Sequence, residues 1–175
     1  MEQKIKKAAA GDIDELVEFY DDMTVYLEQT INYPVWKRYI YPARHNIKAA
    51  VENGEMFMLA VDRDLAAAVI LNHSQPPEYA EGDWTIEAED SDIIVVHTLG
   101  VHYHYYRRGI AKKMMDFVRG YAEQCGAKTV RLDAAVGNSP AIALYEKIGY
   151  RYAGDTVLHP ENEGDIPVRL YELVF

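Results

Sequence analysis

The sequence has little cysteine, no long apolar run and no excess of basic charge. Its one cysteine, Cys125, cannot form an intrachain disulfide and has no CxxC context, which favours a packing role. No run approaches the roughly 18 apolar residues that a membrane span needs, and the basic N-terminus lacks the apolar segment of a secretion signal. These absences predict a cytoplasmic protein without a membrane partner.

The charge of the chain is acidic and unevenly placed. The 28 Asp and Glu against 18 Lys and Arg give a net charge of −10, whereas nucleic-acid-binding surfaces usually show a basic stripe, so we expect no nucleic-acid partner. Residues 78–92 hold seven acids and no Lys or Arg, and residues 107–113 hold four bases and no acid. The basic pole suits an anionic cofactor. The acidic pole suits a cationic amine, and it equally fits a solvated loop.

The pattern of apolar residues predicts an α/β fold. With 175 residues, 49% of them hydrophobic, the chain can bury one core, which favours a single domain over residues 1–175. Helical spacing predicts four helices, at 12–27, 43–52, 110–126 and 139–149, with Asp12 and Ser139 as N-caps. Apolar runs and alternation predict strands at 3–9, 56–61, 65–71, 93–104, 128–133, 150–157 and 166–174. This order indicates a three-layer domain with a mixed central sheet of about six to seven strands.

The turn that follows the strand at 93–104 is the most informative segment. The first N–H groups of a helix have no partner within it, and the helix dipole adds positive charge, so an anion completes this geometry. Gly109 has no Cβ and lets the backbone approach a ligand closely. Full charges around the same turn come from Arg107, Arg108, Lys112 and Lys113. The turn therefore predicts a diphosphate site.

Two common nucleotide motifs are absent from this turn. No GxxxxGK(S/T) occurs, which excludes a Walker loop, and Ile110 and Ala111 follow a single glycine, which excludes the dinucleotide GxGxxG fingerprint. What remains resembles the central motif of the GCN5-related N-acetyltransferase (GNAT) family, Gln/Arg-x-x-Gly-x-Gly/Ala. Gly109 and Ala111 match it, and Tyr106 stands at the leading Gln/Arg position, which removes one side-chain contact.

A second segment strengthens the resemblance. It starts 29 residues after Gly109, where residues 138–150, NSPAIALYEKIGY, are similar to the family pattern N-x-x-(A/S)-x-x-(L/F)-Y-x-x-x-G-(F/Y). The resemblance implies a three-layer GNAT-like fold and acetyl-CoA as acyl donor. It also implies that the strand before the turn splays from the strand after the next helix, so that pantetheine lies in the cleft and pairs with a free strand edge.

The resemblance implies roles for the cofactor-binding residues. Leu99 and Val101 take positions whose main chain contacts the acetyl carbonyl and the pantetheine arm, with Gly100 permitting an irregular backbone; both side chains also suit the core. Asn138 binds the cofactor or the splayed strand, and it fits a turn residue equally well. The phosphates and the pantetheine arm are further expected to contact Arg107, Arg108, Gly109, Ile110, Ala111, Lys112, Ser139 and Tyr145.

Two residues are candidates for proton transfer. By resemblance, Tyr145 points at the CoA sulfur and can protonate the departing thiolate as general acid; otherwise it is a buried aromatic residue. His97 lies two residues before Leu99, which predicts that both side chains lie on the same strand face. The local sequence from His97 to His102 is similar to that of the arylalkylamine acetyltransferase branch of the family, where a His takes a proton. A packed His97, with a Glu or a water chain as base, is the competing interpretation. His102 and His104 have no acid or Cys at ligand spacing, so we expect no metal.

The sequence says less about the acceptor than about the acyl donor. Aromatic residues in the variable half of the family shape the acceptor pocket, which makes Tyr26, Trp36, Tyr41 and Trp84 candidates, although core packing explains most aromatic residues. We predict an acetyl-CoA-dependent N-acetyltransferase whose acceptor, a small-molecule amine or a peptide amine, attacks the thioester directly in a ternary complex. The alternatives are a non-catalytic acyl-CoA-binding or sensing module and a protein N-terminal acetyltransferase. A homodimer fits a small α/β enzyme.

Overall fold

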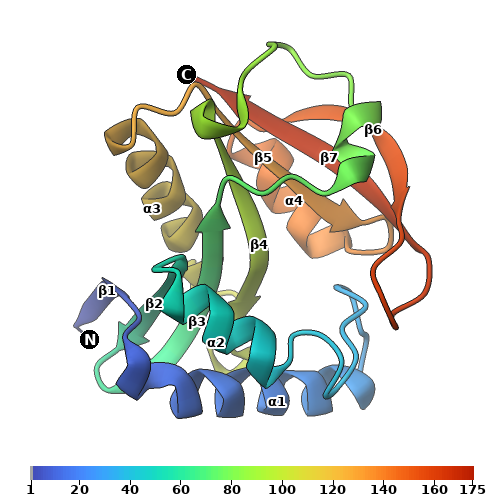
Figure 1. Ribbon diagram of the computed structural model, residues 1–175. Helices are drawn as coiled ribbons and strands as arrows, with labels where there is room; N and C mark the ends of the chain where they lie inside the picture. Colours follow the sequence, from blue (N-terminus) through green and yellow to red (C-terminus); the bar gives the residue numbers. More distant parts are fainter. Residues whose placement is uncertain (1) are drawn as a thin grey trace. The chain divides into compact units, whose positions relative to one another are not determined.

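The computed structural model describes residues 2–175, which fall into two compact units (Figure 1). The first unit contains residues 2–32, Trp36–Leu71 and His97–Met115. The second contains Tyr33–Val35, Asn72–Val96 and Asp116–Phe175. The single domain expected from chain length stays a prediction.

Residues 2–175 form four α-helices and one mixed sheet of seven strands in the order β1-β2-β3-β4-β5-β7-β6, which confirms the predicted α/β class with a mixed sheet of about six to seven strands. The strands are β1 (Gln3–Lys7), β2 (Met56–Val61), β3 (Asp64–Asn72), β4 (Ile93–Val101), β5 (Thr129–Ala135), β6 (Arg151–Leu158) and β7 (Ile166–Val174). The helices are α1 (Ile13–Glu28), α2 (Arg44–Glu52), α3 (Ile110–Gln124) and α4 (Ser139–Lys147). Among residues 2–175 no helix is long and apolar enough to cross a membrane.

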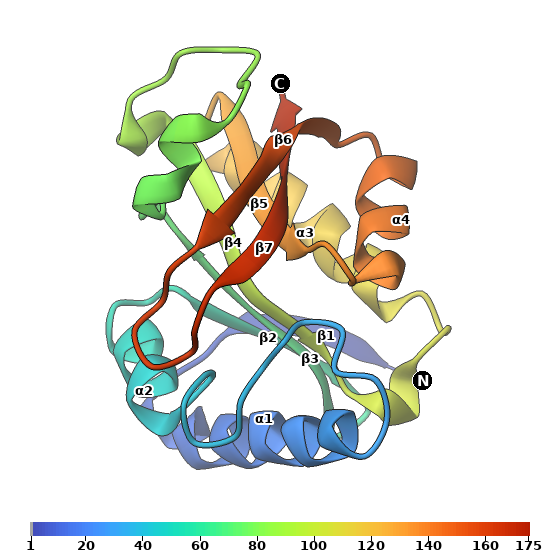
Figure 2. The same ribbon diagram turned by 90° about the vertical axis from the view of Figure 1, so that its right-hand side faces the viewer.

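The core of the first unit lies between two helices and three antiparallel strands. Helices α1 and α2 lie along β1, β2 and β3 (Figures 1 and 2), and β1 and β3 both pair antiparallel with β2. The helical periodicity of α1 places Leu16, Tyr20 and Met23 in the core, where they pack with Ile47 of α2 and Met58 of β2. This packing fixes α1 beside the sheet.

The second unit is built on the antiparallel strands β5, β7 and β6, with a smaller apolar cluster that includes Tyr79 and Leu170. In the parallel pair β4–β5 the register consists of three residue pairs, from Ile93 with Thr129 to Val95 with Arg131. Strand β4 nevertheless runs on to Val101 and β5 to Ala135. The pairing therefore covers only the first third of β4.

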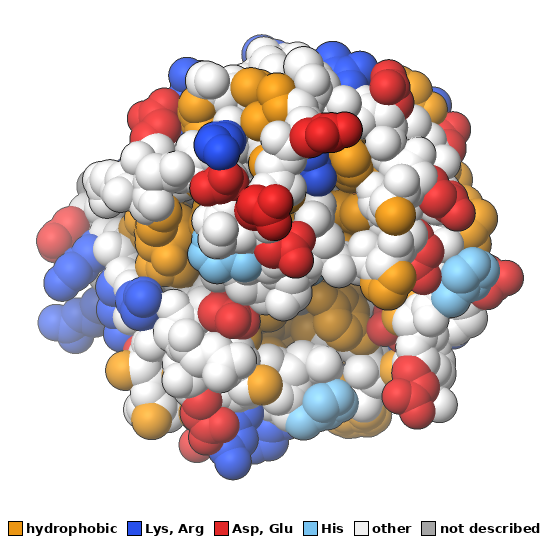
Figure 3. Space-filling model, turned by 45° about the horizontal axis from the view of Figure 1, so that its top comes forward, with side chains coloured by type: hydrophobic (Ala, Val, Ile, Leu, Met, Phe, Trp, Pro, Cys, Tyr) orange, Lys and Arg blue, Asp and Glu red, His pale blue; other side chains and the backbone are white. Residues whose placement is uncertain are grey.

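The acidic segment 78–92 is tied down by several of its acids. Glu78 accepts a hydrogen bond from the amide of His159 at 3.2 Å, and Glu81 accepts one from the Thr156 hydroxyl at 2.5 Å. Asp92 accepts one from Lys128 Nζ at 2.5 Å. Figure 3 shows acidic side chains on the face that carries this segment. These three carboxylates hold the segment to its neighbours, while Glu81, Asp83, Glu87, Glu89 and Asp90 are exposed, so the amine-attracting pole and the solvated loop both stay predictions.

Several element ends differ from the sequence prediction by one to three residues. Strand β4 ends at Val101 instead of residue 104, because residues 103–105 turn into a short 3₁₀ helix. The N-cap of α4 is Asn138, not Ser139, since the Asn138 side chain accepts from the amide of Ala141 at 3.3 Å. Asp12 is the N-cap residue of α1 as predicted, but its carboxylate accepts from the Ala9 amide at 2.8 Å and makes no hydrogen bond to an amide of the helix.

Candidate active site

The turn before α3 has the backbone that an anion site requires. Arg107 and Gly109 both adopt left-handed conformations, with φ of 59° and 76°. The amide of Lys113 donates the first helical bond, to the carbonyl of Gly109 at 3.0 Å, so the amides of residues 109–111 have no partner within the helix. Residues 106–109 are exposed. Left-handed residues in a tight turn orient successive amides toward one point, which makes a concavity for an anion.

Not all of the basic side chains around this turn are directed at a phosphate bound there. The guanidinium of Arg108 lies over the ring of Tyr105, 5.6 Å from its centroid, and the Arg107 side chain is exposed. Lys113 is directed elsewhere, because its Nζ donates to Oε1 of Gln3 on β1 at 2.6 Å. The charge available to a phosphate at the turn therefore comes first from the two arginines.

The irregular residue of β4 is Thr98, which has a φ of 56°. Gly100, which was predicted to permit an irregular backbone, is not among the positive-φ residues, and that role stays a prediction. A Cβ on Gly100 would lie 3.2 Å from the Tyr20 ring and 3.3 Å from Met23 Sδ, so this glycine admits α1 to the strand. The left-handed Thr98 also interrupts the pleat, so spacing alone does not put His97 and Leu99 on one face.

A hydrogen bond at the end of β4 shows which way the amides of this strand point. The amide of His102 donates to the carbonyl of Ala66 on β3 at 2.9 Å. Successive N–H groups along a strand point to opposite edges, and this alternation turns the amides of Leu99 and Val101 away from β3. These are the two residues whose main chain the sequence assigns to the acetyl group and the pantetheine arm.

In the second unit, Tyr145 is buried on α4 and lies near two other tyrosines. Its ring centroid is 5.9 Å from that of Tyr150 and 6.0 Å from that of Tyr171. Burial, and then the charge of Asp133, raise the pKa of the Tyr145 phenol well above its ordinary value. The phenol is therefore protonated at neutral pH, which a proton donor requires. Asn138, at the start of α4, has the turn role that was one of its two predicted interpretations.

Asp133 is a candidate site residue that the sequence analysis missed. Its carboxylate accepts a hydrogen bond from the Tyr79 hydroxyl at 2.7 Å. Desolvation raises the pKa of Asp133 to about 6, against the opposing effect of the Tyr79 hydrogen bond. The available signal was one acid within the apolar strand TVRLDAA, because a desolvated carboxylate with a shifted pKa is a common feature of catalytic sites.

The four predicted acceptor residues make contacts within their own units. Trp36 is 7% exposed and packs edge-on against Tyr20, which supports the core interpretation. Tyr26 stacks on Tyr103 with centroids 4.2 Å apart. In the second unit, Trp84 donates to the Tyr79 carbonyl at 2.7 Å and lies under the Arg131 guanidinium. Tyr41 is half-buried, and its hydroxyl is 2.5 Å from Thr98 Oγ1. An acceptor role for these residues stays a prediction.

The histidine pair is joined to α1. His102 Nε2 is 2.9 Å from Oδ2 of Asp22, and His102 Nδ1 accepts from the amide of His104 at 3.4 Å. Tyr103 donates to the same carboxylate oxygen at 3.1 Å. Among residues 2–175 no group of three or more His, Cys, Asp or Glu side chains has the geometry of a metal site. Through its contact with Asp22, His102 connects the segment before the turn to α1.

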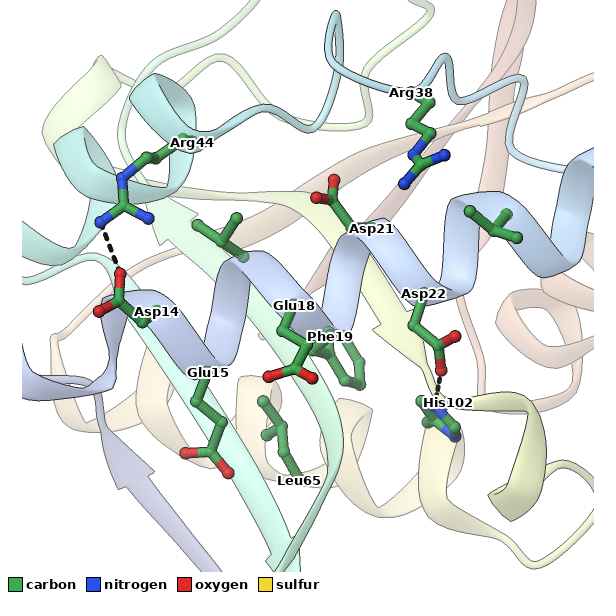
Figure 4. A pocket seen from close by; sticks show the side chains of 12 residues that line it. Asp14, Glu15, Glu18, Phe19, Asp21, Asp22, Arg38, Arg44, Leu65 and His102 are labelled. Atoms are coloured by element: carbon green, nitrogen blue, oxygen red, sulfur yellow. Dashed lines mark hydrogen bonds and ion pairs between the residues drawn. The ribbon is translucent and has the colours of Figure 1, made fainter.

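An open, acidic cavity of about 690 Å³ lies along α1 in the first unit (Figure 4). Figure 4 shows two ion pairs there: Asp14 with Arg44, 2.6 Å apart, and Asp22 with His102. The lining residues include none of the predicted cofactor-binding or catalytic residues. The cavity is an acidic surface separate from the cofactor turn.

Comparison with known proteins identifies relatives. The sequence model of the acetyltransferase (GNAT) family matches residues 14–150. The chain is 25% identical over 112 residues to the uncharacterized N-acetyltransferase YesJ of Bacillus subtilis (strain 168). That alignment covers 63% of this chain and 60% of the relative, so it spans less than two thirds of the relative's length.

Solved structures share the fold over nearly the whole chain. A GNAT-family acetyltransferase from Streptococcus agalactiae 2603 is 20% identical with a TM-score of 0.79, covering 99% of this chain and 95% of that one. An N-acetyltransferase from Staphylococcus aureus Mu50 has a TM-score of 0.74 at 17% identity, covering 99% of both chains. The acetyltransferase yncA from Salmonella typhimurium, solved with its cofactor acetyl-CoA, has a TM-score of 0.71 at 13% identity and covers 99% of this chain and 94% of that one.

Proposed function

The chain belongs to the acetyltransferase (GNAT) family, and from this premise we propose that it transfers the acetyl group of acetyl-CoA to a primary amine. In this proposal the amine nitrogen attacks the thioester carbonyl directly while both substrates are bound. The carbon–sulfur bond then breaks and releases CoA as a thiol. The net charge of −10 favours a cationic acceptor, because it attracts ammonium groups to the protein.

The observation that carries the proposal is the backbone of the turn before α3. Left-handed residues at 107 and 109 and the unpartnered amides of 109–111 suit the pyrophosphate of CoA. Arg107 and Arg108 supply charge beside the amides, and Ile110, Ala111 and Lys112 form the first turn of the helix. The two phosphates of CoA together present more acceptor oxygens than a carboxylate does, so they match several converging donors better.

The amides of Leu99 and Val101 are assigned to the acyl end of the donor. An amide that points away from β3 can donate to a pantetheine carbonyl, or to the acetyl oxygen as that oxygen becomes negative. Asn138 and Ser139 stand at the start of α4, where the side-chain nitrogen Nδ2 of Asn138 and the exposed Ser139 are assigned to the cofactor. Each contact uses polar groups while the apolar side chains pack.

Two proton transfers complete the reaction. Tyr145 donates its phenolic proton to the departing thiolate, which is consistent with the burial that keeps it protonated. The ammonium group of the acceptor must lose a proton before its nitrogen can attack, and two groups are candidates for the base. Asp133 has a pKa raised to about 6 and its charge acts on Tyr145, whereas His97 is supported by its position on β4 and by the resemblance to the arylalkylamine acetyltransferase branch. We therefore favour Asp133, acting directly or through water.

Thiol release tests the function. The protein is incubated with acetyl-CoA and a panel of small amines and peptides, and free CoA is measured. Release with small amines supports the proposal, and Tyr145→Phe should then lower kcat about tenfold or more with acetyl-CoA binding unchanged. Release with peptides alone favours a protein N-terminal acetyltransferase. Binding of acetyl-CoA without any release favours a non-catalytic sensing module.

The base is tested by the pH dependence of kcat/KM. If Asp133 is the base, Asp133→Asn removes the acidic limb near pH 6, and His97→Ala keeps it. The opposite result assigns the proton transfer to His97. If both variants keep the limb, neither residue takes the proton.

A further inference from the structure

Thr98 adopts a backbone conformation that its side chain disfavours. Its φ is 56°, in the left-handed region, and it is β-branched, so the conformation is a genuine outlier for this residue type. It lies within β4, directly before Leu99, where extended geometry is the rule. A residue in such a conformation persists only where the surrounding structure holds it.

Two tyrosine hydroxyls hold Thr98. Tyr20 of α1 donates its phenolic hydrogen to the Thr98 carbonyl oxygen at 2.8 Å. The Tyr41 hydroxyl lies 2.5 Å from Thr98 Oγ1. One tyrosine thus binds the main chain and the other binds the side chain. Three parts of the sequence meet at one residue, because α1, the segment between α1 and α2, and β4 each contribute a partner.

Tyr20 is itself held rigidly in the core. It has no exposed surface, and its ring lies edge-on to Phe19, with centroids 5.0 Å apart, and to Trp36, with centroids 5.6 Å apart. Gly100 allows this close approach, since a Cβ there would lie 3.2 Å from the Tyr20 ring. The hydroxyl that binds the Thr98 carbonyl therefore has little freedom to move, and the carbonyl is fixed with it.

The carbonyl of Thr98 and the amide of Leu99 belong to the same planar peptide. A donor that fixes one fixes the direction of the other. We propose that Tyr20 and Tyr41 are positioning residues that keep Thr98 left-handed and so aim the Leu99 amide at the thioester carbonyl. The inference rests on the proposed acetyl transfer and assigns Tyr41, predicted as an acceptor residue, to the geometry of the oxyanion contact.

A positioning role for Tyr41 and a role in binding the acceptor predict different kinetic effects. An amide aimed at the developing oxyanion acts in the transition state more than in the ground state, so its loss lowers kcat with little change in KM. A tyrosine in the acceptor pocket would chiefly affect the acceptor KM. Tyr41→Phe removes the hydroxyl and keeps the ring. Tyr39→Phe is a matched control from the same segment, because Tyr39 is 69% exposed.

The expected result for Tyr41→Phe is a fall in kcat of about tenfold, with the acetyl-CoA Kd from calorimetry and the acceptor KM within about twofold of wild type. Thr98→Val removes the hydroxyl partner from the other side, and it should reproduce the loss if Tyr41→Phe folds poorly. Thermal unfolding of each variant reports on folding. Tyr39→Phe should leave every quantity unchanged.

A double-mutant cycle gives the decisive comparison. Glycine adopts positive φ without strain, so Thr98→Gly needs no tyrosine hydroxyl to remain left-handed. In the Thr98→Gly background, Tyr41→Phe should change kcat by less than about twofold. An equal loss of kcat in both backgrounds would overturn the inference, as would a Tyr41→Phe variant with wild-type kcat or a rise in acceptor KM alone.

Different results would contradict the positioning role and the proposed acetyl transfer. If the wild-type protein binds acetyl-CoA and releases thiol while Tyr41→Phe and Thr98→Val retain full kcat, only the positioning role is wrong. If the wild-type protein neither binds acetyl-CoA nor releases thiol, the proposed function is wrong and the positioning role with it.

Discussion

At the scale of single residues, two desolvated polar groups of the second unit, Asp133 and the Tyr150 hydroxyl, should destabilise the fold. Asp133 is desolvated on β5, and its pKa is raised as a result. The hydroxyl of Tyr150 is buried and has no hydrogen-bond partner within residues 2–175. Groups of this kind are uncommon where only packing is required. Replacing either group should change the free energy of unfolding, which can be measured without an activity assay.

Asp133→Asn should stabilise the protein at neutral pH. A carboxyl whose folded pKa of about 6 exceeds its ordinary 3.8 holds its proton more tightly when folded, so the stability it contributes is lost as pH rises from about 4 to about 6. At pH 7.5 the free energy of unfolding of the variant should exceed that of wild type by about 1–3 kcal/mol, because a tenfold change in a protonation equilibrium corresponds to about 1.4 kcal/mol. Urea unfolding at pH 4 and pH 7.5 measures the difference.

The advantage of Asp133→Asn should shrink toward zero at pH 4. Glu161→Gln, at an exposed position between β6 and β7, is the matched control and should show no such pH dependence. A variant less stable than wild type at pH 7.5 would show that the carboxylate is stabilised by its surroundings and not desolvated.

Tyr150→Phe should also stabilise the protein. A buried hydroxyl without a partner costs about 1–3 kcal/mol, and for a chain of this size each 1 kcal/mol raises Tm by about 2–4 °C. Tyr171→Phe is the matched control, because the Tyr171 hydroxyl donates to Glu146 at 2.9 Å and its removal should lower Tm. Calorimetric melting of both variants distinguishes them. Equal decreases would mean that Tyr150 has a partner after all.

At the scale of elements, glycine positions decide how closely helix and strand approach. Gly100 has the rings of Tyr20 and Phe19 within 3.3 Å of a built Cβ, so Gly100→Ala should push α1 from β4 and destabilise by about 1–3 kcal/mol. Gly120, inside α3, has nothing within 4 Å, so Gly120→Ala should stabilise by about 0.5–1 kcal/mol. Denaturant unfolding of the pair tests both signs. A tolerated Gly100→Ala would contradict the tight α1–β4 contact.

The turn before α3 supports a second matched pair. Gly109 and Gly126 have φ of 76° and 73°, and neither has a neighbour within 4 Å of a built Cβ. Asparagine tolerates this conformation, so both Gly→Asn variants should fold. A side chain at 109 would block the approach of a phosphate, and acetyl-CoA affinity should fall at least about tenfold in Gly109→Asn. Gly126→Asn should bind as wild type does, and equal affinities would place the cofactor elsewhere.

Element types are predictable from the sequence, while their exact ends and irregularities depend on long-range contacts. Periodicity predicts the helices and strands because burial of one face imposes it. The left-handed Thr98 was not predictable, since a β-branched residue disfavours that conformation and its two tyrosine partners lie 78 and 57 residues away in sequence. Asp133 was missed for a related reason, because its desolvation and its Tyr79 partner come from the tertiary fold.

At the scale of the whole molecule, membership of the acetyltransferase (GNAT) family gives the class of chemistry, and the distribution of charge bears on the acceptor. A net charge of −10 with bases gathered before α3 suits a protein that binds an anionic cofactor locally and attracts cationic amines generally. The acids of segment 78–92 were predicted to attract an amine or to form a solvated loop, and three of them make hydrogen bonds that hold the segment to its neighbours. A cationic acceptor is therefore argued from total charge and not from that segment.

The account depends most on the binding of acetyl-CoA at the turn that contains Gly109. Isothermal titration of acetyl-CoA into the wild-type protein tests this directly. We expect saturable binding of one molecule per chain with a Kd between about 1 μM and 1 mM, the range of typical enzyme KM values. No heat at millimolar acetyl-CoA would contradict the account.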